Sequence, residues 1–181
     1  TQPTGGALVS ARPYAIDASG VGSVVKLGRA NAPGGEITIS NAIRAHTAIE
    51  MYASSTSGGT AAVHLTASSL LETLSGGMQL TPYGDAVFEG ELIARGSDAD
   101  VVITARDTLE LRGSITAQRN ILVSAGTVTT AGEVSLRTVG TSTLTTLDAG
   151  GRIVLEGRND VVIDSQVGVG NPGLELLRIG S

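Results

Sequence analysis

The sequence contains no cysteine and no tryptophan, and its 181 residues include only one phenylalanine and three tyrosines. Without cysteine, disulfides, thiolate metal sites and thiol catalysis are excluded. Aromatic side chains usually fill much of the volume of a globular core. A core in this chain must therefore be built from Val, Ile, Leu and Ala, which suits a narrow interior of repeated small layers better than a wide two-layer domain.

Positive charge and long apolar runs are also scarce. The chain has 12 basic and 17 acidic residues, a net charge of −5, and Lys26 is its only lysine. The arginines are scattered, whereas nucleic-acid binding needs clustered basic residues. No apolar run reaches the ~18 residues of a membrane-spanning helix, and residues 1–10 do not have the pattern of a signal peptide. We expect the chain to be a fragment of a longer protein.

Apolar and polar residues alternate in short runs through the second half of the chain, which is typical of half-buried strands. The apolar starts of these runs form three columns that recur in strict cyclic order: Val101, Ile121, Val139 and Val161; Leu109, Val128, Leu147 and Val167; Ile115, Val134, Ile153 and Leu174. Such a cycle indicates a solenoid. The sequence therefore predicts an all-β fold, a right-handed parallel β-helix with about 20 residues and three strands per coil.

The first half of the chain repeats less regularly. Its columns continue with longer steps through Ile43, Leu70 and Leu92, through Ile49 and Met78, and through Val63 and Val87. We expect one domain over residues 1–181, with irregular coils in 1–95 and regular coils in 96–176. The extra residues are predicted to form loops at Ser54 to Thr60 and at Pro82 to Asp85. Residues 62–74 fit either a strand, which we favour, or one face of a helix that ends at Gly76 and Gly77.

Two stretches carry a resemblance to a known family: DTLELRGSITAQRNILVSAGTVTTAGEVSLRT (residues 107–138) and AGGRIVLEGRNDVVIDS (residues 149–165). Their repeat pattern resembles that of the filamentous-haemagglutinin-like exoproteins. In this pattern a Gly or Asn is followed by a short alternating strand and a turn of small residues. These exoproteins are large bacterial adhesins exported by two-partner secretion. The resemblance covers about residues 98–169. It implies a β-helical shaft on a secreted or cell-surface protein. The family's amino-terminal secretion motifs with Asn-Pro-Asn are missing, so the resemblance implies a shaft or distal module.

Acidic or amide residues precede the first column at Asp100, Asn120 and Asp160. They could form a ladder of oxygen ligands for Ca²⁺, or they could stabilise corners by bonding their own backbone. We favour the corner interpretation, because the Gly-Gly-x-Gly-x-Asp repeat of calcium-binding β-rolls is absent. If Ca²⁺ binds, Asp98 and Asp100 are the best candidates, and no other metal ligand or cofactor is predicted.

Other candidate catalytic groups lack a supporting pattern. Asp160 and Asp164, with Arg158 nearby, resemble the acidic faces of glycan-cleaving β-helices. Glycoside hydrolysis, however, needs two carboxyl groups about 5 to 9 Å apart, one of them with a raised pKa. His46 and His64 belong to no triad or zinc motif. We therefore predict no catalytic residues and no enzyme activity.

The outward position of the first-column strands is unexpectedly apolar. It is occupied by Val102, Leu122 and Val162, with Gly140 expected to interrupt the row in the coil between. The row is either a packing stripe for adjacent repeats or a partner, or a consequence of the preference of Val for sheets. We predict a non-catalytic adhesive module that presents binding loops to a receptor or glycan. Glycan-binding or glycan-cleaving β-helices and a calcium-binding repeat module stay open as alternatives.

Overall fold

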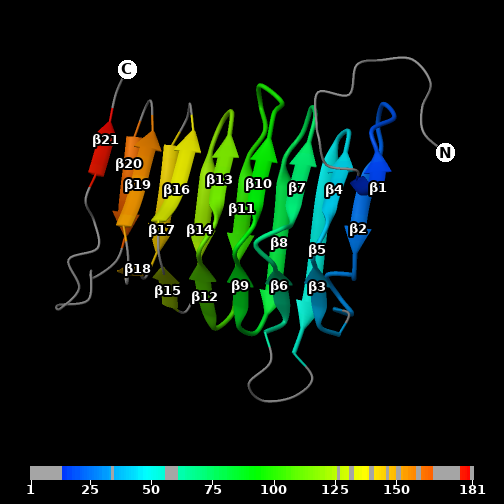
Figure 1. Cartoon of the computed structure of the whole chain (residues 1–181), viewed down its shortest axis with the longest axis horizontal. Helices are drawn as coiled ribbons and strands as arrows, with labels where there is room; N and C mark the ends of the chain where they lie inside the picture. The colour runs from blue at the N-terminus through cyan, green and yellow to red at the C-terminus, as the bar shows by residue number, and fades with distance from the viewer. Residues whose placement is uncertain are drawn as a thin grey trace.

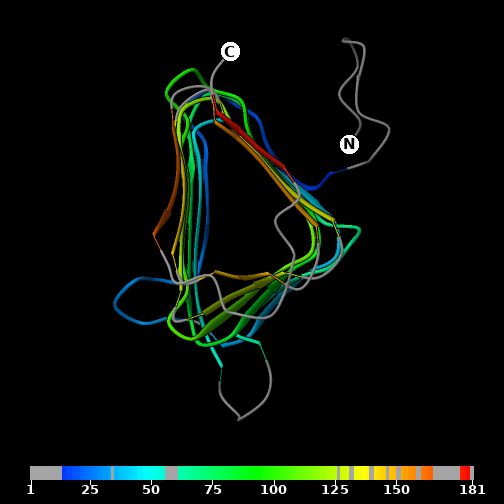
Figure 2. The same cartoon turned by 90° about the vertical axis from the view of Figure 1, so that its left-hand side faces the viewer.

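The computed structural model is a right-handed parallel β-helix, as the sequence predicts. It describes residues 14–33, 35–55, 61–125 and 127–130, and the backbone of strands within 133–138, 141–145, 147–149, 152–157, 160–164 and 176–179. Every regular element in these residues is a strand. The described part of the chain contains no helix that is long and apolar enough to cross a membrane. Figure 1 shows the strands side by side along the long axis, and Figure 2 shows the three-sided outline seen from one end.

The described strands form three parallel sheets, one on each side of that outline. Sheet 1 consists of β1 (Tyr14–Ala18), β4 (Ala42–Ala45), β7 (Leu70–Thr73), β10 (Glu91–Ala94), β13 (Ser114–Ala117), β16 (Glu133–Thr138), β19 (Arg152–Gly157) and β21 (Leu176–Ile179). Sheet 2 consists of β2 (Val24–Leu27), β5 (Ala48–Ser54), β8 (Met78–Tyr83), β11 (Val101–Thr104), β14 (Ile121–Ser124), β17 (Thr141–Thr145) and β20 (Asp160–Asp164). Sheet 3 consists of β3 (Ile37–Ile39), β6 (Val63–Leu65), β9 (Ala86–Phe88), β12 (Thr108–Leu111), β15 (Thr127–Thr130) and β18 (Leu147–Ala149).

Each coil crosses the three sheets in the same order, so a strand pairs with its counterpart one coil away. On sheet 1, Tyr14 pairs with Ala42, and Ala42 pairs in turn with Leu70. Later coils are shorter: Glu91 pairs with Ser114, and Ser135 pairs with Val154. The early coils are therefore longer than the later ones.

The core is a column of aliphatic side chains that point inward from all three sheets. The largest fully buried side chains are Ile49, Met51, Leu65, Leu71, Leu80, Leu92, Ile103, Leu109, Leu111 and Ile121. Full burial of such a side chain contributes about 1.5–3 kcal/mol. Phe88, the single phenylalanine, is also buried. Because each coil buries its apolar side only against its neighbours, the coils are stable as a stack and not one by one.

The corner between sheets 3 and 1 depends on stacked glycines. A Cβ on Gly113 would lie 1.9 Å from the carbonyl oxygen of Gly90, and a Cβ on Gly90 would lie 2.5 Å from the carbonyl oxygen of Ser69. Backbone from one coil thus occupies the space of a side chain in the next, and only glycine fits. This contact explains why glycine recurs at this corner.

Two expectations for the first half have different outcomes. Residues 62–74 contain the strands β6 and β7 and no helix, because β7 pairs on both edges, with β4 and with β10. The loop expected at Pro82 to Asp85 is shorter than predicted: Pro82 and Tyr83 are the last residues of β8 and pair with β5, and only Gly84 and Asp85 connect β8 to β9. Of the loop expected at Ser54 to Thr60, residues 56–60 lie outside the described part of the chain.

Several column assignments are confirmed by the register. Ile121 pairs with Val101, and Met78 pairs with Ile49. In sheet 3, Leu109, Val128 and Leu147 pair in succession, as predicted. Val167 and Leu174 lie outside the described residues.

Other assignments are shifted along the chain by a few positions. Ile121 pairs with Ser142, not with a strand at Val139. Ile115 pairs with Leu136 rather than Val134. In the first half, Ile43 and Leu92 pair with Leu71, and Val63 pairs with Ala86. Leu70 and Val87 therefore point to the opposite face from the one predicted, because neighbouring residues of a strand face opposite sides.

Candidate binding face

The outer face of sheet 2 carries a row that changes from charged to apolar along the axis. Its residues are in register from β2 to β14: Lys26, Glu50, Gln79, Val102 and Leu122. Lys26 Nζ lies 2.9 Å from Glu50 Oε2. Val102 is half-buried, and Leu122 is 39% exposed. The row thus ends in a short aliphatic surface beside polar side chains.

The predicted packing stripe is only partly continuous. Val102 and Leu122 are direct neighbours on β11 and β14. Thr143 of β17 then occupies the row before Val162 of β20. The interruption therefore falls on a threonine in register, not on Gly140, because β17 begins at Thr141. We define the aliphatic pair Val102 and Leu122, whose side chains are described, as the binding row.

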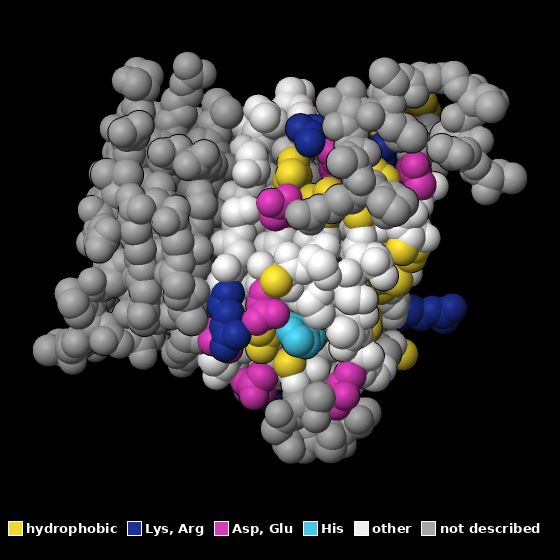
Figure 3. Space-filling view, viewed as in Figure 1, with side chains coloured by type: hydrophobic (Ala, Val, Ile, Leu, Met, Phe, Trp, Pro, Cys, Tyr) yellow, Lys and Arg dark blue, Asp and Glu magenta, His cyan; other side chains and the backbone are white. Residues whose placement is uncertain are grey.

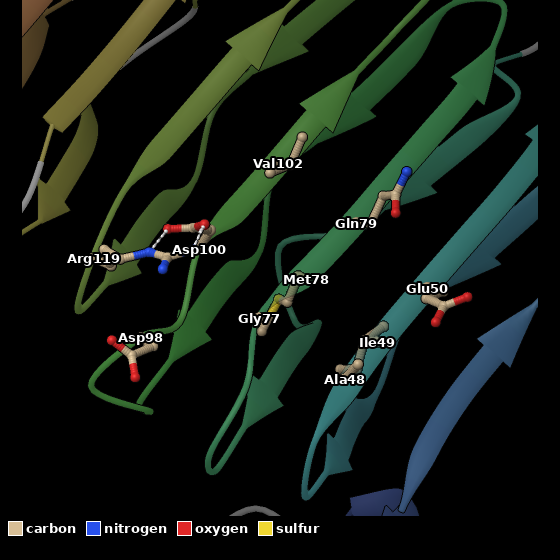
Figure 4. A pocket seen from close by; sticks show the side chains of 10 residues that line it. All are labelled: Ala48, Ile49, Glu50, Gly77, Met78, Gln79, Asp98, Asp100, Val102 and Arg119. Carbon is tan, nitrogen blue, oxygen red and sulfur yellow. Dashed lines mark hydrogen bonds and ion pairs between the residues drawn. The ribbon is translucent and has the colours of Figure 1, made fainter.

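A shallow hollow of about 320 Å³ adjoins the binding row where strands of sheet 2 begin. Figure 4 shows its lining, in which Val102 and Gln79 lie toward one end and Asp98, Asp100 and Arg119 toward the other. A Cβ on Gly77 would lie 2.4 Å from the carbonyl oxygen of Asp100. The hollow therefore places the Val102 side chain near several charged and polar side chains.

Asp100, one of the two calcium candidates, is held by the next coil. Its Oδ1 accepts hydrogen bonds from Arg119 Nε at 2.8 Å, from the Asn120 backbone N–H at 3.0 Å and from Asn120 Nδ2 at 3.1 Å. Its Oδ2 accepts from Arg119 Nη2. The hydrogen bond from Arg119 lowers the pKa of Asp100 below its ordinary value, against the opposing effect of burial.

These contacts differ from the corner chemistry expected, in which Asp and Asn bond their own backbone: Asp100 bonds Arg119 and the Asn120 backbone one coil away. Asp98 adds only an electrostatic contribution that raises the pKa of Arg119, after the larger effect of Asp100. No cluster of three or more His, Cys, Asp or Glu residues suited to a metal occurs among the described residues. Calcium binding at Asp98 and Asp100 stays an open alternative, in which the cation would have to compete with Arg119.

A second charged cluster, on the outer face of sheet 1, was not predicted from the sequence. Glu72 is 3% exposed. Its Oε2 accepts from Arg44 Nε at 2.8 Å and from the Tyr14 hydroxyl, and its Oε1 accepts from Arg95 Nε at 2.5 Å. The Arg44 guanidinium lies 3.8 Å from the centre of the Tyr14 ring, a cation–π contact. We call these four residues the Glu72 cluster.

The Glu72 carboxyl group is ionised at neutral pH. Burial raises its pKa, but the hydrogen bonds from Tyr14, Arg95 and Arg44 outweigh burial and hold the pKa below its ordinary value. A general acid needs the opposite shift. One feature of the sequence could have indicated this residue: Glu72 is the only charged residue of the largely apolar run from Leu70 to Leu74, and an acid in such a run needs a partner when it is buried.

The two histidines lie apart and make local contacts. His46 Nδ1 is 3.0 Å from Ser75 Oγ, at the corner between sheets 1 and 2. His64 Nε2, on β6 of sheet 3, is 3.4 Å from Glu89 Oε2, and Glu89 Oε1 accepts from Arg112 at 2.8 Å. Figure 3 shows a histidine side chain among acidic and basic ones on this face. The fold does not assemble the two histidines into one site.

Asp160 and Asp164 are the first and last residues of β20. Their spacing along the strand places their Cα atoms about 13 Å apart at ~3.3 Å per residue. Their side chains and Arg158 lie outside the described part of the structure. The glycan-cleaving alternative therefore stays open.

Comparison with known proteins adds no relative. No family model matches the chain, and neither the curated proteins nor the solved structures contain a match. The fold and its surfaces are therefore the basis for a functional proposal.

Proposed function

We propose that the chain is a non-catalytic structural and adhesive module of a large secreted or cell-surface bacterial protein. The observation that carries the proposal is the binding row: Leu122 is 39% exposed and is in register with Val102 on the outer face of a rigid sheet. An aliphatic surface beside polar groups is the composition of a protein-contact patch. The β-helix holds this patch at a fixed place on a rod.

The charged groups support a role without catalysis. Two described carboxyl groups, those of Glu72 and Asp100, have shifted pKa values, and both pKa values are lowered. Each is hydrogen-bonded to arginine, as in a structural ion pair. Proton transfer at neutral pH needs a group with a pKa near 7, and neither carboxyl group has that property.

The resemblance of residues 98–169 to filamentous-haemagglutinin-like exoproteins supports the cellular setting of the proposal. Such a shaft needs regular coils, and the described register from Leu70 to Ser135 advances in nearly equal steps on sheet 1. The partner in this setting is a receptor or glycan on a host or neighbouring cell, or an adjacent repeat of the same protein.

A cell-binding assay with matched variants tests the proposal. Fluorescent protein is applied to epithelial cells, and bound fluorescence is measured for the wild type, Val102→Thr, Leu122→Thr and Val87→Thr. Val87 is an outward residue of β9 on sheet 3, so Val87→Thr makes the same chemical change on another face. We expect at least a threefold loss of binding for the two sheet 2 variants and none for Val87→Thr. If the wild type does not bind, or if all four proteins bind equally, the binding row is not the surface that contacts cells.

Glycan binding is a second candidate, favoured by tyrosines on the same sheet. Tyr52 and Tyr83 alternate with buried residues of β5 and β8, so both lie on the outer face of sheet 2. A hollow of about 350 Å³ beside Tyr83 is also lined by Arg106. Aromatic rings and hydrogen-bonding groups are the usual contacts of sugars. A glycan array should show binding that Tyr83→Ala abolishes, with no release of reducing sugar; release of reducing sugar would indicate a glycan-cleaving enzyme instead.

A further inference from the structure

Two arginines at the corner between sheets 2 and 3 have no acidic partner. Arg29 lies between β2 and β3, and Arg106 lies between β11 and β12. Both are exposed, and neither forms an ion pair or a side-chain hydrogen bond within the described part of the chain. The described arginines that do pair with a carboxylate are Arg44, Arg95, Arg112 and Arg119. On a chain of net charge −5, two unpaired cations at one corner provide a local attraction for anions.

The acids near Arg106 do not engage its guanidinium group. Asp85 Oδ1 accepts a hydrogen bond from the Thr108 backbone N–H at 3.0 Å. Asp107, the next residue along the chain, is exposed and forms no ion pair among the described residues. The planar fork of the Arg106 guanidinium group therefore keeps its hydrogen-bond donors available for a ligand.

Tyr83 lies beside Arg106 and is anchored at its hydroxyl group. The Arg106 N–H donates to the Pro82 carbonyl oxygen at 3.0 Å, which places Arg106 next to Tyr83 in the neighbouring coil. The Tyr83 hydroxyl donates to the carbonyl oxygen of Ala30, the residue after Arg29, at 3.1 Å. Figure 2 shows the loop after β2 projecting from this corner. The Tyr83 side chain is therefore tied to the loop that carries Arg29, and its backbone is adjacent to Arg106.

A hollow of about 350 Å³ opens beside Tyr83 and Arg106. Its lining consists of Thr81, Pro82, Tyr83, Thr104, Ala105 and Arg106. Thr81 and Thr104 lie on the outer face of β8 and β11, because they alternate with buried residues of these strands. The lining therefore combines an aromatic ring, two hydroxyl groups and a guanidinium group.

These groups match the parts of an acidic sugar. The C–H groups of a sugar ring pack on an aromatic ring, and sugar hydroxyls exchange hydrogen bonds with threonine hydroxyls. A carboxylate accepts two parallel hydrogen bonds from one guanidinium group. A neutral sugar in the same place would shield Arg106 from water without offering it an anion, which is unfavourable. On the basis of the glycan binding proposed above, we propose that this hollow takes an acidic saccharide, whose carboxylate pairs with Arg106 and whose ring packs on Tyr83.

Matched pairs of acidic and neutral saccharides test the preference for a carboxylate. The acids are a trisaccharide of glucuronic acid and sialyllactose, and the neutral partner of each is its methyl ester. Binding to the full chain is measured by titration calorimetry. We expect at least one acid to bind at least about tenfold more tightly than its ester. The pair that shows the preference distinguishes a uronic acid from a sialic acid as the source of the carboxylate.

Arg106→Gln tests the residue that receives the carboxylate. It should lower the affinity for the acid at least about tenfold and leave the affinity for the ester unchanged. Arg112→Gln is the matched control, because Arg112 is an exposed arginine whose charge is already paired with Glu89 and Glu110 on sheet 3. It should leave both affinities unchanged. Arg106→Lys keeps the charge without the planar fork and should retain part of the preference for the acid.

The possible failures are distinguishable. Equal affinities for the acids and their esters, with binding lost in Tyr83→Ala, would overturn the acidic preference and leave glycan binding intact. If none of the four saccharides binds, the acidic preference is wrong; neutral glycans bound on the array would then keep the glycan function, and an empty array would exclude both. Equal losses of acid binding in Arg106→Gln and Arg112→Gln would mean that the hollow does not select the acid.

Salt dependence replaces the variant if Arg106→Gln does not fold, as judged from its melting curve. Binding of the acid to the wild type should weaken at least about tenfold between about 50 mM and about 500 mM NaCl, and binding of the ester should not change. Acid binding that is independent of salt would refute the pairing with Arg106.

Discussion

Arg44 donates a 2.8 Å hydrogen bond from Nε to the carboxylate of Glu72, its register partner one coil away on sheet 1. Both side chains are largely removed from solvent, at 17% and 4% exposed. Breaking a buried pair by removing one partner leaves the other charge uncompensated, which costs about 3–5 kcal/mol. The Glu72 cluster is therefore a local determinant of stability.

Glu72→Ala should lower the free energy of unfolding by about 3 kcal/mol, because Arg44 keeps its buried charge without a counterion. Urea unfolding followed by circular dichroism measures the change. Glu50→Ala is the control: Glu50 pairs with Lys26, whose side chain is 61% exposed, so the loss should stay below about 1 kcal/mol. Equal losses in the two variants would contradict the special role of Glu72.

The stability of the wild type should fall at acid pH through Glu72. Its pKa in the folded chain is lowered from an ordinary value of 4.5. The ionised group therefore contributes its full stabilisation above about pH 5, and the contribution is lost as the pH falls through 4.5 toward the folded pKa. Asp100 acts in the same direction. Unfolding free energies from pH 7 to pH 3 should show Glu72→Gln converging toward the wild type; a constant gap would refute the assignment.

Gly113→Ala should destabilise the chain by about 1–3 kcal/mol or more, since its Cβ would meet the carbonyl oxygen of Gly90 at 1.9 Å. Gly35→Ala is a matched control, because a Cβ there has no heavy atom within 4 Å. Thermal melting of both variants against the wild type gives the comparison. A Gly113→Ala melting temperature equal to that of Gly35→Ala would argue against the backbone stack.

Leu109→Ala and Leu122→Ala test the inward and outward faces. Leu109 is fully buried and Leu122 is 39% exposed. We expect the free energy of unfolding to fall by about 2–5 kcal/mol in Leu109→Ala. In Leu122→Ala it should fall by about 1 kcal/mol or less. Chemical denaturation measures both. A larger loss for Leu122→Ala would mean that this side chain is covered in solution, for example by association of two chains, which sedimentation would detect.

Calcium should leave the melting temperature unchanged. The Asp100 carboxylate already accepts hydrogen bonds from Arg119 and Asn120 with both oxygens, and a cation would have to displace the guanidinium. Melting curves with excess EDTA and with millimolar Ca²⁺ should coincide, since only a ligand that binds the folded chain raises its stability. A clear rise with Ca²⁺ that Asp98→Asn removes would restore the calcium hypothesis.

The three-column cycle sufficed to predict the fold class, but the register needed the structure. A shift by an even number of positions, as from Val134 to Leu136 opposite Ile115, keeps every side chain on its face, so the alternating pattern cannot distinguish the two. In the run Leu70-Leu71 both residues are apolar, and Ala86-Val87-Phe88 has the same ambiguity. There the choice of the inward residue depends on pairing with the neighbouring coils.

The candidate site was predictable only in part. Val102 and Leu122 were found because both lie in regular coils, one short step apart. The Glu72 cluster draws its members from β1, β4, β7 and the residue after β10, and the long early coils keep these members far apart in the sequence. No local spacing in the sequence indicates that Tyr14, Arg44 and Arg95 converge on one carboxylate.

The coil-to-coil pairing also has a mechanical consequence. The ladder hydrogen bonds run along the long axis, so a force that pulls the ends apart loads successive coils in series, and they should peel away one after another. Tyr14 in the first coil bonds directly to Glu72 in the third, and Arg95 reaches the same carboxylate from the fourth. Peeling of the first coil must therefore break a cross-link that skips a layer, which should raise the force needed to detach that coil.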